Sequence, residues 1–214
     1  MSAWTRLKSW LGWAARAPVA VAPASMTPAP AAVAQHGIEH VGIEHAGVAR
    51  DFPALFCVVE VADAEFLVGD LFRRRFATDS FPASPKHFVA FYKSEDGGLL
   101  ALGYVHFEIW EGQALGGGLV IDERAYRRVP AAERAAIRAR GGVAEAMLRA
   151  SFALLPADLV AIWAYIGDAL SEKVNRRVGF LPTGERHVRV IWRNEPDAAG
   201  KARCLQRVVE YGPF

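Results

Sequence analysis

The sequence predicts an α/β (α+β) domain over residues 51–214, in which helices flank a mixed, mostly antiparallel sheet. Three observations predict it. The chain is 52% apolar, short β-rich runs alternate with helical patterns after residue 50, and 214 residues is close to the upper size of one domain. This apolar content can offset the ordering entropy, which excludes a disordered chain. No apolar run approaches the roughly 18 residues of a membrane-spanning helix.

The elements follow from apolar periodicity and from the turn and cap residues between them. Asp63 can cap the first helix, and Arg73, Arg74 and Arg75 end it, where cations suit the helix dipole. The predicted strands are residues 56–61, 87–93, 99–110, 113–122, 159–166, 186–193 and 203–211, and the predicted helices are residues 63–76, 131–140, 143–155 and 168–177. Counting the two adjacent helical segments before residue 159 together, the order is β-α-βββ-α-β-α-ββ.

Two of these elements have a clear inner face. In the helix over 143–155, Met147, Leu148 and Phe152 recur at helical spacing after Val143, so one stripe is apolar. Residues 159–166 form an apolar run without alternation, which is typical of a strand buried on both faces. The second half of the domain therefore supplies a covered strand and the helix that covers it.

Residues 1–50 differ in composition and are predicted to be a flexible extension. An Ala/Pro tract over 17–34 favours an extended, solvated backbone and predicts a linker. Before it, three Trp and three basic residues leave alternatives open for residues 4–13: a helix on a membrane surface or a partner, a weak secretory signal, a disordered tail, or a helix that docks on the protein's own surface. The repeat Gly-Ile-Glu-His at 37–40 and 42–45 has a spacing of five, which fits one face of neither a helix nor a strand, so we predict no metal site.

Charge and cysteine content exclude other classes. A net charge of +2 argues against a dedicated nucleic-acid binder, which usually carries a basic stripe. Cys57 and Cys204 are too few for a disulfide scaffold or a structural zinc site, and we expect both to be reduced, in a cytoplasmic protein. The cytoplasmic assignment leaves room for membrane association through the N-terminal segment.

Two stretches, together with the element order, resemble the GCN5-related N-acetyltransferases (GNAT), over about residues 56–211. The first stretch is Gly118-Leu119-Val120-Ile121-Asp122, followed after an interval by Arg140-Gly141-Gly142-Val143-Ala144 and a helix. The second begins at Asp168-Ala169-Leu170-Ser171 and leads to Asn175-Arg176-Arg177-Val178-Gly179-Phe180. The resemblance implies a splayed sheet that admits the acyl-pantetheine arm of acetyl-CoA, and it implies no metal.

The resemblance also implies binding residues for acetyl-CoA. Glycines at a helix N-terminus suit a diphosphate, because unpaired N–H groups and the helix dipole attract anions. Gly142 and Ala144 match the family's Gly-x-Ala, but the arginine register falls on Ala139, between Arg138 and Arg140. The implied set is Leu119, Val120, Ile121, Arg138, Arg140, Gly141, Gly142, Val143, Ala144, Asp168 and Ser171.

The implied chemistry is direct attack of a primary amine on the thioester, with the oxyanion held by the Leu119 N–H. Asn175 stands where the family usually has a tyrosine that protonates the leaving thiolate, and an amide cannot give up a proton in that way. For the base that takes the ammonium proton we consider Glu108, Glu111, Asp122 and His106, and we choose Glu108.

The sequence therefore predicts an acyl-CoA-dependent N-acetyltransferase, with acceptor class, acyl length and oligomeric state left open. Two alternatives remain. One is a weak or inactive acyl-CoA-binding sensor on the same scaffold, which the departure at Asn175 favours. The other is a surface-tethered interaction protein that acts through its Trp-rich tail.

Overall fold

A computed structural model describes residues 50–84 and 86–214, which include most of the predicted domain. The extension over 1–49, with its Trp-rich segment, linker and Gly-Ile-Glu-His repeat, lies outside the described residues. The strands are β1 (Phe56–Glu60), β2 (Lys86–Lys93), β3 (Leu99–Trp110), β4 (Gln113–Gly116), β5 (Val120–Ile121), β6 (Ala161–Tyr165), β7 (Leu181–Pro182) and β8 (Val188–Trp192). The helices are α2 (Phe52–Leu55), α3 (Ala64–Phe76), α4 (Glu123–Arg128), α5 (Ala131–Ala139), α6 (Gly142–Leu154), α7 (Ala169–Val178) and α8 (Ala198–Tyr211).

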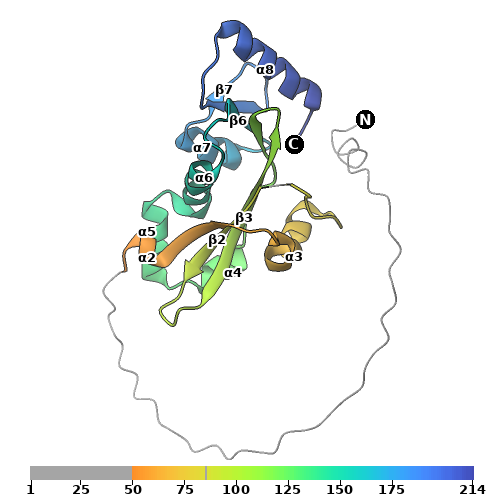
Figure 1. Ribbon diagram of the computed structural model, residues 1–214. Helices are drawn as coiled ribbons and strands as arrows, with labels where there is room; N and C mark the ends of the chain where they lie inside the picture. Colours follow the sequence, from red (N-terminus) through yellow and green to blue (C-terminus); the bar gives the residue numbers. More distant parts are fainter. Residues whose placement is uncertain (1–49, 85) are drawn as a thin grey trace, which may run out of the picture. The chain divides into compact units, whose positions relative to one another are not determined.

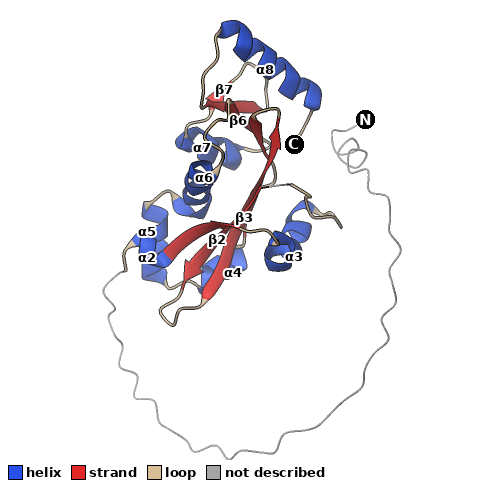
Figure 2. Cartoon of the chain, viewed as in Figure 1, coloured by secondary structure: helices blue, strands red, loops and turns tan. Residues whose placement is uncertain are grey.

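All eight strands belong to one mixed sheet, with helices on its faces (Figure 2). The order along the sheet is β1-β2-β3-β4-β6-β8-β7, and β5 pairs with β3 beside β4. Neighbouring strands are antiparallel except β4 and β6, which run parallel. The long α6 crossover between β4 and β6 explains this exception, because a parallel pair needs such a connection. The predicted fold class is confirmed.

Alternation along β2 assigns the two faces of the sheet. Phe88 and Tyr92 pack in the cluster that contains Met147 of α6, whereas Val89 and Phe91 pack with Phe72 of α3. Successive side chains of a strand point to opposite faces, so α6 and α3 cover opposite sides of the sheet. Figure 1 shows the two helices on either side of β2 and β3.

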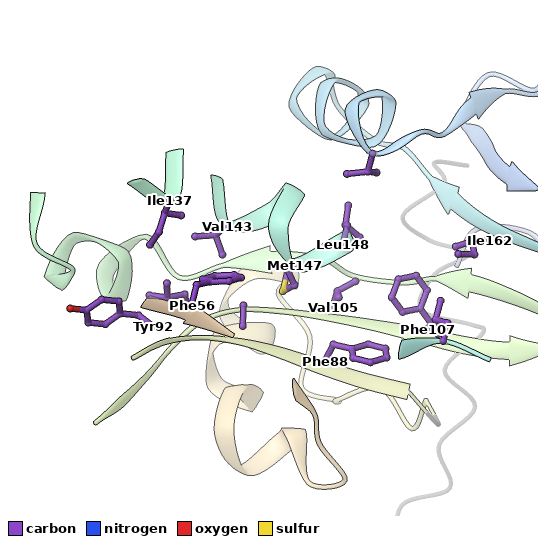
Figure 3. Close-up of a cluster of buried hydrophobic side chains, with 14 of the residues drawn as sticks. Phe56, Phe88, Tyr92, Val105, Phe107, Ile137, Val143, Met147, Leu148 and Ile162 are labelled. Atoms are coloured by element: carbon purple, nitrogen blue, oxygen red, sulfur yellow. The ribbon is translucent and has the colours of Figure 1, made fainter. Parts of the chain in front are cut away.

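Helix α6 packs along its predicted apolar stripe. Val143, Met147 and Leu148 are at most 5% exposed, and Figure 3 shows them lying over the strands with Val105 and Phe107 below. Burying aliphatic side chains of this size contributes about 1.5–3 kcal/mol each. The position of α6 on the sheet is therefore fixed by the residues that the periodicity identified.

Helix α5, an insertion between β5 and α6, is held by a buried carboxylate. Glu133 is 7% exposed and accepts hydrogen bonds from the Tyr92 hydroxyl and from Arg50 Nε, the latter at 2.9 Å. Burial and the Glu133 carboxylate raise the pKa of Tyr92 to about 12, so the phenol stays a donor. A buried carboxylate requires such partners, and here they join α5 to β2 and to the start of the domain.

The structure differs from the prediction at several places, and α2 and β7 are also elements that the sequence did not predict. The predicted strand over 203–211 is helix α8, which Asp197 caps through the Gly200 N–H at 2.7 Å. Cys204, Leu205 and Val208 pack on β6 and β8 at the 3–4 spacing of a helix, which explains the error. The predicted strand over 113–122 is broken into β4 and β5, and α4 was not foreseen.

Candidate functional site

The sheet parts where β4 ends. β4 pairs in parallel with β6 from Gln113–Ala161 to Gly116–Ala164, and then the chain leaves β6. Residues 117–119 belong to no strand, and β5 pairs only with β3, at Val120–Tyr104 and Ile121–Gly103. Within the described residues, the second edge of β5 has no partner strand. Its backbone N–H and C=O groups are thus free to pair with an extended ligand.

Glycines make this parting possible. A Cβ atom at Gly117 would overlap the imidazole ring of His106, and one at Gly118 would lie 2.7 Å from Phe76 Cζ. At Gly116 a Cβ atom would lie 3.0 Å from the Trp163 carbonyl oxygen. The segment runs too close to its neighbours for any larger residue, which is the usual reason for glycine at a close approach of backbone.

His106 lies directly against this glycine segment. Its backbone carbonyl accepts a hydrogen bond from the Gly117 N–H at 3.0 Å. Its Nδ1 atom is buried and, among the described residues, has no hydrogen-bond partner. Burial, with a smaller contribution from nearby His87, lowers the pKa of His106 to about 3. The imidazole is therefore neutral near pH 7.

Aromatic rings from α3, β2 and β3 enclose His106. The rings of Tyr104 and Phe72 lie 5.7 and 6.0 Å from it, and the Tyr104 hydroxyl is 2.7 Å from His87 Nδ1. Burial lowers the pKa of His87 and raises that of Tyr104, so both groups stay neutral. The α3 side of the parting is thus a neutral, aromatic wall with a single unpaired imidazole nitrogen.

The predicted diphosphate cradle forms in part. Gly141 and Gly142 have φ of 92° and 86°, values that favour glycine, and they lead into α6. Within the described residues, the N–H groups of Gly142, Val143 and Ala144 have no hydrogen-bond partner. A carboxylate, however, already lies there: Glu145 packs against Gly141 and is paired with Arg149 at 2.9 Å. An incoming phosphate would have to displace it.

Arg138 and Arg140, the two arginines expected to bind the diphosphate, do not both lie at the start of α6. The Arg140 guanidinium lies 5.9 Å from the Phe52 ring centroid, which places it over α2. Arg138 is exposed in the last turn of α5.

The predicted polar residues of α7 are engaged within their own helix. Asp168 caps α7 by accepting hydrogen bonds from the N–H groups of Leu170 and Ser171, at 2.8 and 2.9 Å. These bonds, chiefly that from the Ser171 N–H, lower the pKa of Asp168. Asn175 donates its side-chain N–H to the Ser171 carbonyl at 2.9 Å. In this arrangement the Asn175 amide is committed to the helix backbone.

This chain is similar to several solved structures at low identity. No family model and no curated protein sequence matches this chain. Among solved structures, it matches the ribosomal-protein-S18-alanine N-acetyltransferase from Escherichia coli, with 11% identity, 67% of this chain and 97% of that chain covered, and a TM-score of 0.37. It matches a probable GNAT-family acetyltransferase from Chromobacterium violaceum with 15% identity, coverage of 79% and 100%, and a TM-score of 0.35.

A third match is a putative N-acetyl transferase from E. coli, determined with coenzyme A bound, with 11% identity, coverage of 64% and 98%, and a TM-score of 0.39. This chain is similar to GNAT acetyltransferases. At such identities and TM-scores the likeness says nothing of the site.

Glu108, the base chosen from the sequence, lies away from the parting. It stands opposite Leu115, within the paired part of β3 and β4, and its carboxylate accepts a 2.7 Å hydrogen bond from the Tyr211 hydroxyl of α8. Burial and this carboxylate raise the pKa of Tyr211. His106, two residues earlier on the same face, is the titratable side chain that the structure places at the glycines. The signal for it was the run Gly116-Gly117-Gly118 opposite a histidine.

In residues 50–84 and 86–214 no group of three or more His, Cys, Asp or Glu side chains could hold a metal ion. No helix in the same part of the chain is long and apolar enough to cross a bilayer.

His106 predicts a pH dependence of stability. The unfolded chain protonates this histidine near pH 6.5, whereas the folded chain resists protonation down to about pH 3. The unfolded state therefore binds more protons between these values, and the free energy of unfolding falls as pH drops through this window. The contribution is up to about 1.4 kcal/mol per pH unit.

Urea unfolding at several pH values between 4 and 7.5 measures this slope. We expect His106→Gln to reduce this slope. Equal slopes in the wild type and in His106→Gln would contradict the prediction.

Proposed function

We propose that this protein is an acyl-CoA-dependent N-acyltransferase that transfers an acetyl group from acetyl-CoA to a primary amine. The observation that carries the proposal is the parting of β5 from β6 at a glycine-only segment. An unpaired strand edge beside a neutral, partly buried histidine can bind an amide-bearing, extended arm and hold a reacting carbonyl next to a proton acceptor.

In this proposal the backbone supplies most of the binding. The pantetheine amides pair with the free edge of β5 near Ile121. The Leu119 N–H, which has no hydrogen-bond partner within the described residues, donates to the oxyanion that forms at the thioester carbonyl. The amine nitrogen forms the new C–N bond, the C–S bond breaks, and the thiolate takes up a proton from solvent or a neighbouring group.

His106 is the base that this geometry favours, in place of Glu108. Nucleophilic attack by an amine leaves an ammonium in the tetrahedral intermediate, and a base within hydrogen-bond reach must accept its proton. His106 is neutral and lies against Gly117, whereas the Glu108 carboxylate is bound by Tyr211. Glu108 remains the alternative base.

The parting of the strands can be tested with a matched pair of glycine variants. Gly117→Ala should abolish acetyl-CoA binding and turnover, because its methyl group displaces the His106 ring that lines the site. Gly167→Ala, where a Cβ atom meets nothing within 4 Å, should retain both. Calorimetry with acetyl-CoA and thiol release with a panel of primary amines are the measurements, with thermal melts to confirm folding. If Gly117→Ala still turns over at the wild-type rate, the parting is not the site.

The identity of the base is tested by a second pair. We expect His106→Gln to lower kcat by about 10²–10⁴-fold with little change in KM for acetyl-CoA, as for loss of a general base. Glu108→Gln, which keeps the contact with Tyr211 sterically intact, should change kcat by less than about threefold. The reverse order of the two effects would assign the role to Glu108.

Glu145 should limit coenzyme affinity if the start of α6 receives the diphosphate. Glu145→Ala removes the carboxylate beside Gly141 and is expected to strengthen coenzyme A binding by several-fold, while costing roughly 0.3–1 kcal/mol of helix stability. Glu172→Ala is the matched control, because Glu172 is also a first-turn carboxylate paired with an arginine, Arg189. Unchanged affinity in Glu145→Ala would place the phosphates elsewhere.

A sensor function remains the second candidate, and one observation favours it. The Asn175 amide is bonded to the Ser171 carbonyl, so the position that should protonate the thiolate offers no acid. Binding of acetyl-CoA without turnover on any amine of the panel would support the sensor. Association through residues 4–13 is a separate proposal, tested by deleting residues 1–49 and measuring vesicle binding.

A further inference from the structure

A cavity of about 260 Å³ lies beside β5 and is lined by residues of α3, β5 and α4. Helices α3 and α4 both contribute lining residues, and both contact β3. Its volume is several times the ~30 Å³ that a water molecule occupies in the liquid. The residues that line it are Leu71, Arg74, Arg75, Val120, Ile121, Asp122, Glu123, Arg124 and Arg127.

Four exposed arginines line this cavity. Within residues 50–84 and 86–214, the guanidinium groups of Arg74, Arg75, Arg124 and Arg127 make no ion pair and no hydrogen bond. Arg73, the neighbour of Arg74 that does not line the cavity, is paired with Glu65 and, at 3.6 Å, with Asp70. Within this turn of α3, the arginine that does not line the cavity is paired with carboxylates, whereas Arg74 and Arg75 are not.

The two carboxylates at the cavity do not neutralise these arginines. Asp122 is the cap of α4 and accepts hydrogen bonds from the Arg124 and Ala125 N–H groups, at 2.9 and 3.1 Å. Glu123 is exposed in the first turn of α4 and pairs with no arginine among the described residues. Like charges gathered in this way repel one another, and an anion in the cavity would relieve the repulsion.

The cavity also adjoins the parting of the sheet. Val120 and Ile121, which line it, are the whole of β5. The positive charge of Arg75 contributes to the lowered pKa of Asp168 at the start of α7. Arg75 therefore interacts electrostatically with a residue across the parting from β5. A ligand bound along the free edge of β5 would therefore have its end within reach of these arginines.

We propose that this cavity binds the phosphate groups of a small ligand through Arg74, Arg75, Arg124 and Arg127. A carboxylate is satisfied by one bidentate guanidinium, whereas a diphosphate offers enough oxygens for several. The planar fork of arginine suits that geometry better than a lysine, and none of the residues lining the cavity is lysine. The proposal does not depend on acyl transfer, because it concerns binding alone.

Calorimetry of the full chain with inorganic pyrophosphate tests the site. We expect one binding event in the wild type and a loss of affinity of about tenfold or more in Arg75→Ala/Arg127→Ala, since each guanidinium removes charge-assisted hydrogen bonds. The control is Arg128→Ala/Arg176→Ala, which removes the same charge from exposed arginines that do not line the cavity. It should bind as the wild type does, and thermal melts should show that both pairs fold.

Two more titrations identify the source of the phosphates. If the Arg75/Arg127 pair weakens coenzyme A and leaves pantetheine, which lacks phosphates, unaffected, the cavity holds the phosphates of the coenzyme. If it weakens pyrophosphate but not coenzyme A, the phosphate belongs to another ligand, such as the acceptor. Either result supports the site.

Absence of pyrophosphate binding at millimolar concentration, or an equal loss in both arginine pairs, would overturn the proposal, because diffuse charge would then account for any affinity. Since no turnover is measured, failure here is distinguishable from failure of the proposed acyl transfer.

Discussion

The close contact between the glycines after β4 and the side chains beneath them is the constraint on which the site depends. His106 and Phe76 occupy the space where side chains of Gly117 and Gly118 would be. The backbone after β4 therefore packs closely against the α3 face, and β5 pairs with β3 alone. It no longer pairs with β6, whose pairing with β4 ends at Gly116. The unpaired edge of β5 follows from this packing, because a strand that contacts α3 so closely cannot also follow β6.

The two faces of the sheet therefore differ in composition and in role. The α6 face is filled by aliphatic and aromatic residues that fix the sheet, including Val105, Met147 and Phe107 (Figure 3). The α3 face combines aromatic packing with the polar groups that burial keeps neutral, namely His87, Tyr104 and His106. A buried imidazole nitrogen without a partner costs stability. Its position at the parting, where a bound substrate could pair with it, gives that cost a functional interpretation.

Sequence reasoning identified what local periodicity encodes. The spacing of Val143, Met147 and Leu148 predicted the buried face of α6. Asp63 and Asp168 cap α3 and α7, the helices predicted to begin at these residues. It failed where tertiary contacts decide. Residues 203–211 alternate in part like a strand, yet Asp197 and the 204–205–208 stripe make them a helix. Nothing local shows that Glu145 packs back onto Gly141, or that Tyr211 reaches Glu108 from about a hundred residues away.

Charge distribution explains why the net charge was a poor guide to ligands. The average of +2 conceals an uneven arrangement. At the start of α6 the positive end of the helix already faces the Glu145 carboxylate, while beside β5 four arginines and two carboxylates line the cavity, and none of the four arginines is in an ion pair among the described residues. An anion that binds near the parting thus has two positive positions available. At the start of α6 the positive charge is already balanced by Glu145, whereas at the cavity beside β5 the arginines are unpaired within the described part of the chain. Because fields within a few ångströms outweigh a chain's average charge, the uncompensated position is where electrostatics favours phosphate.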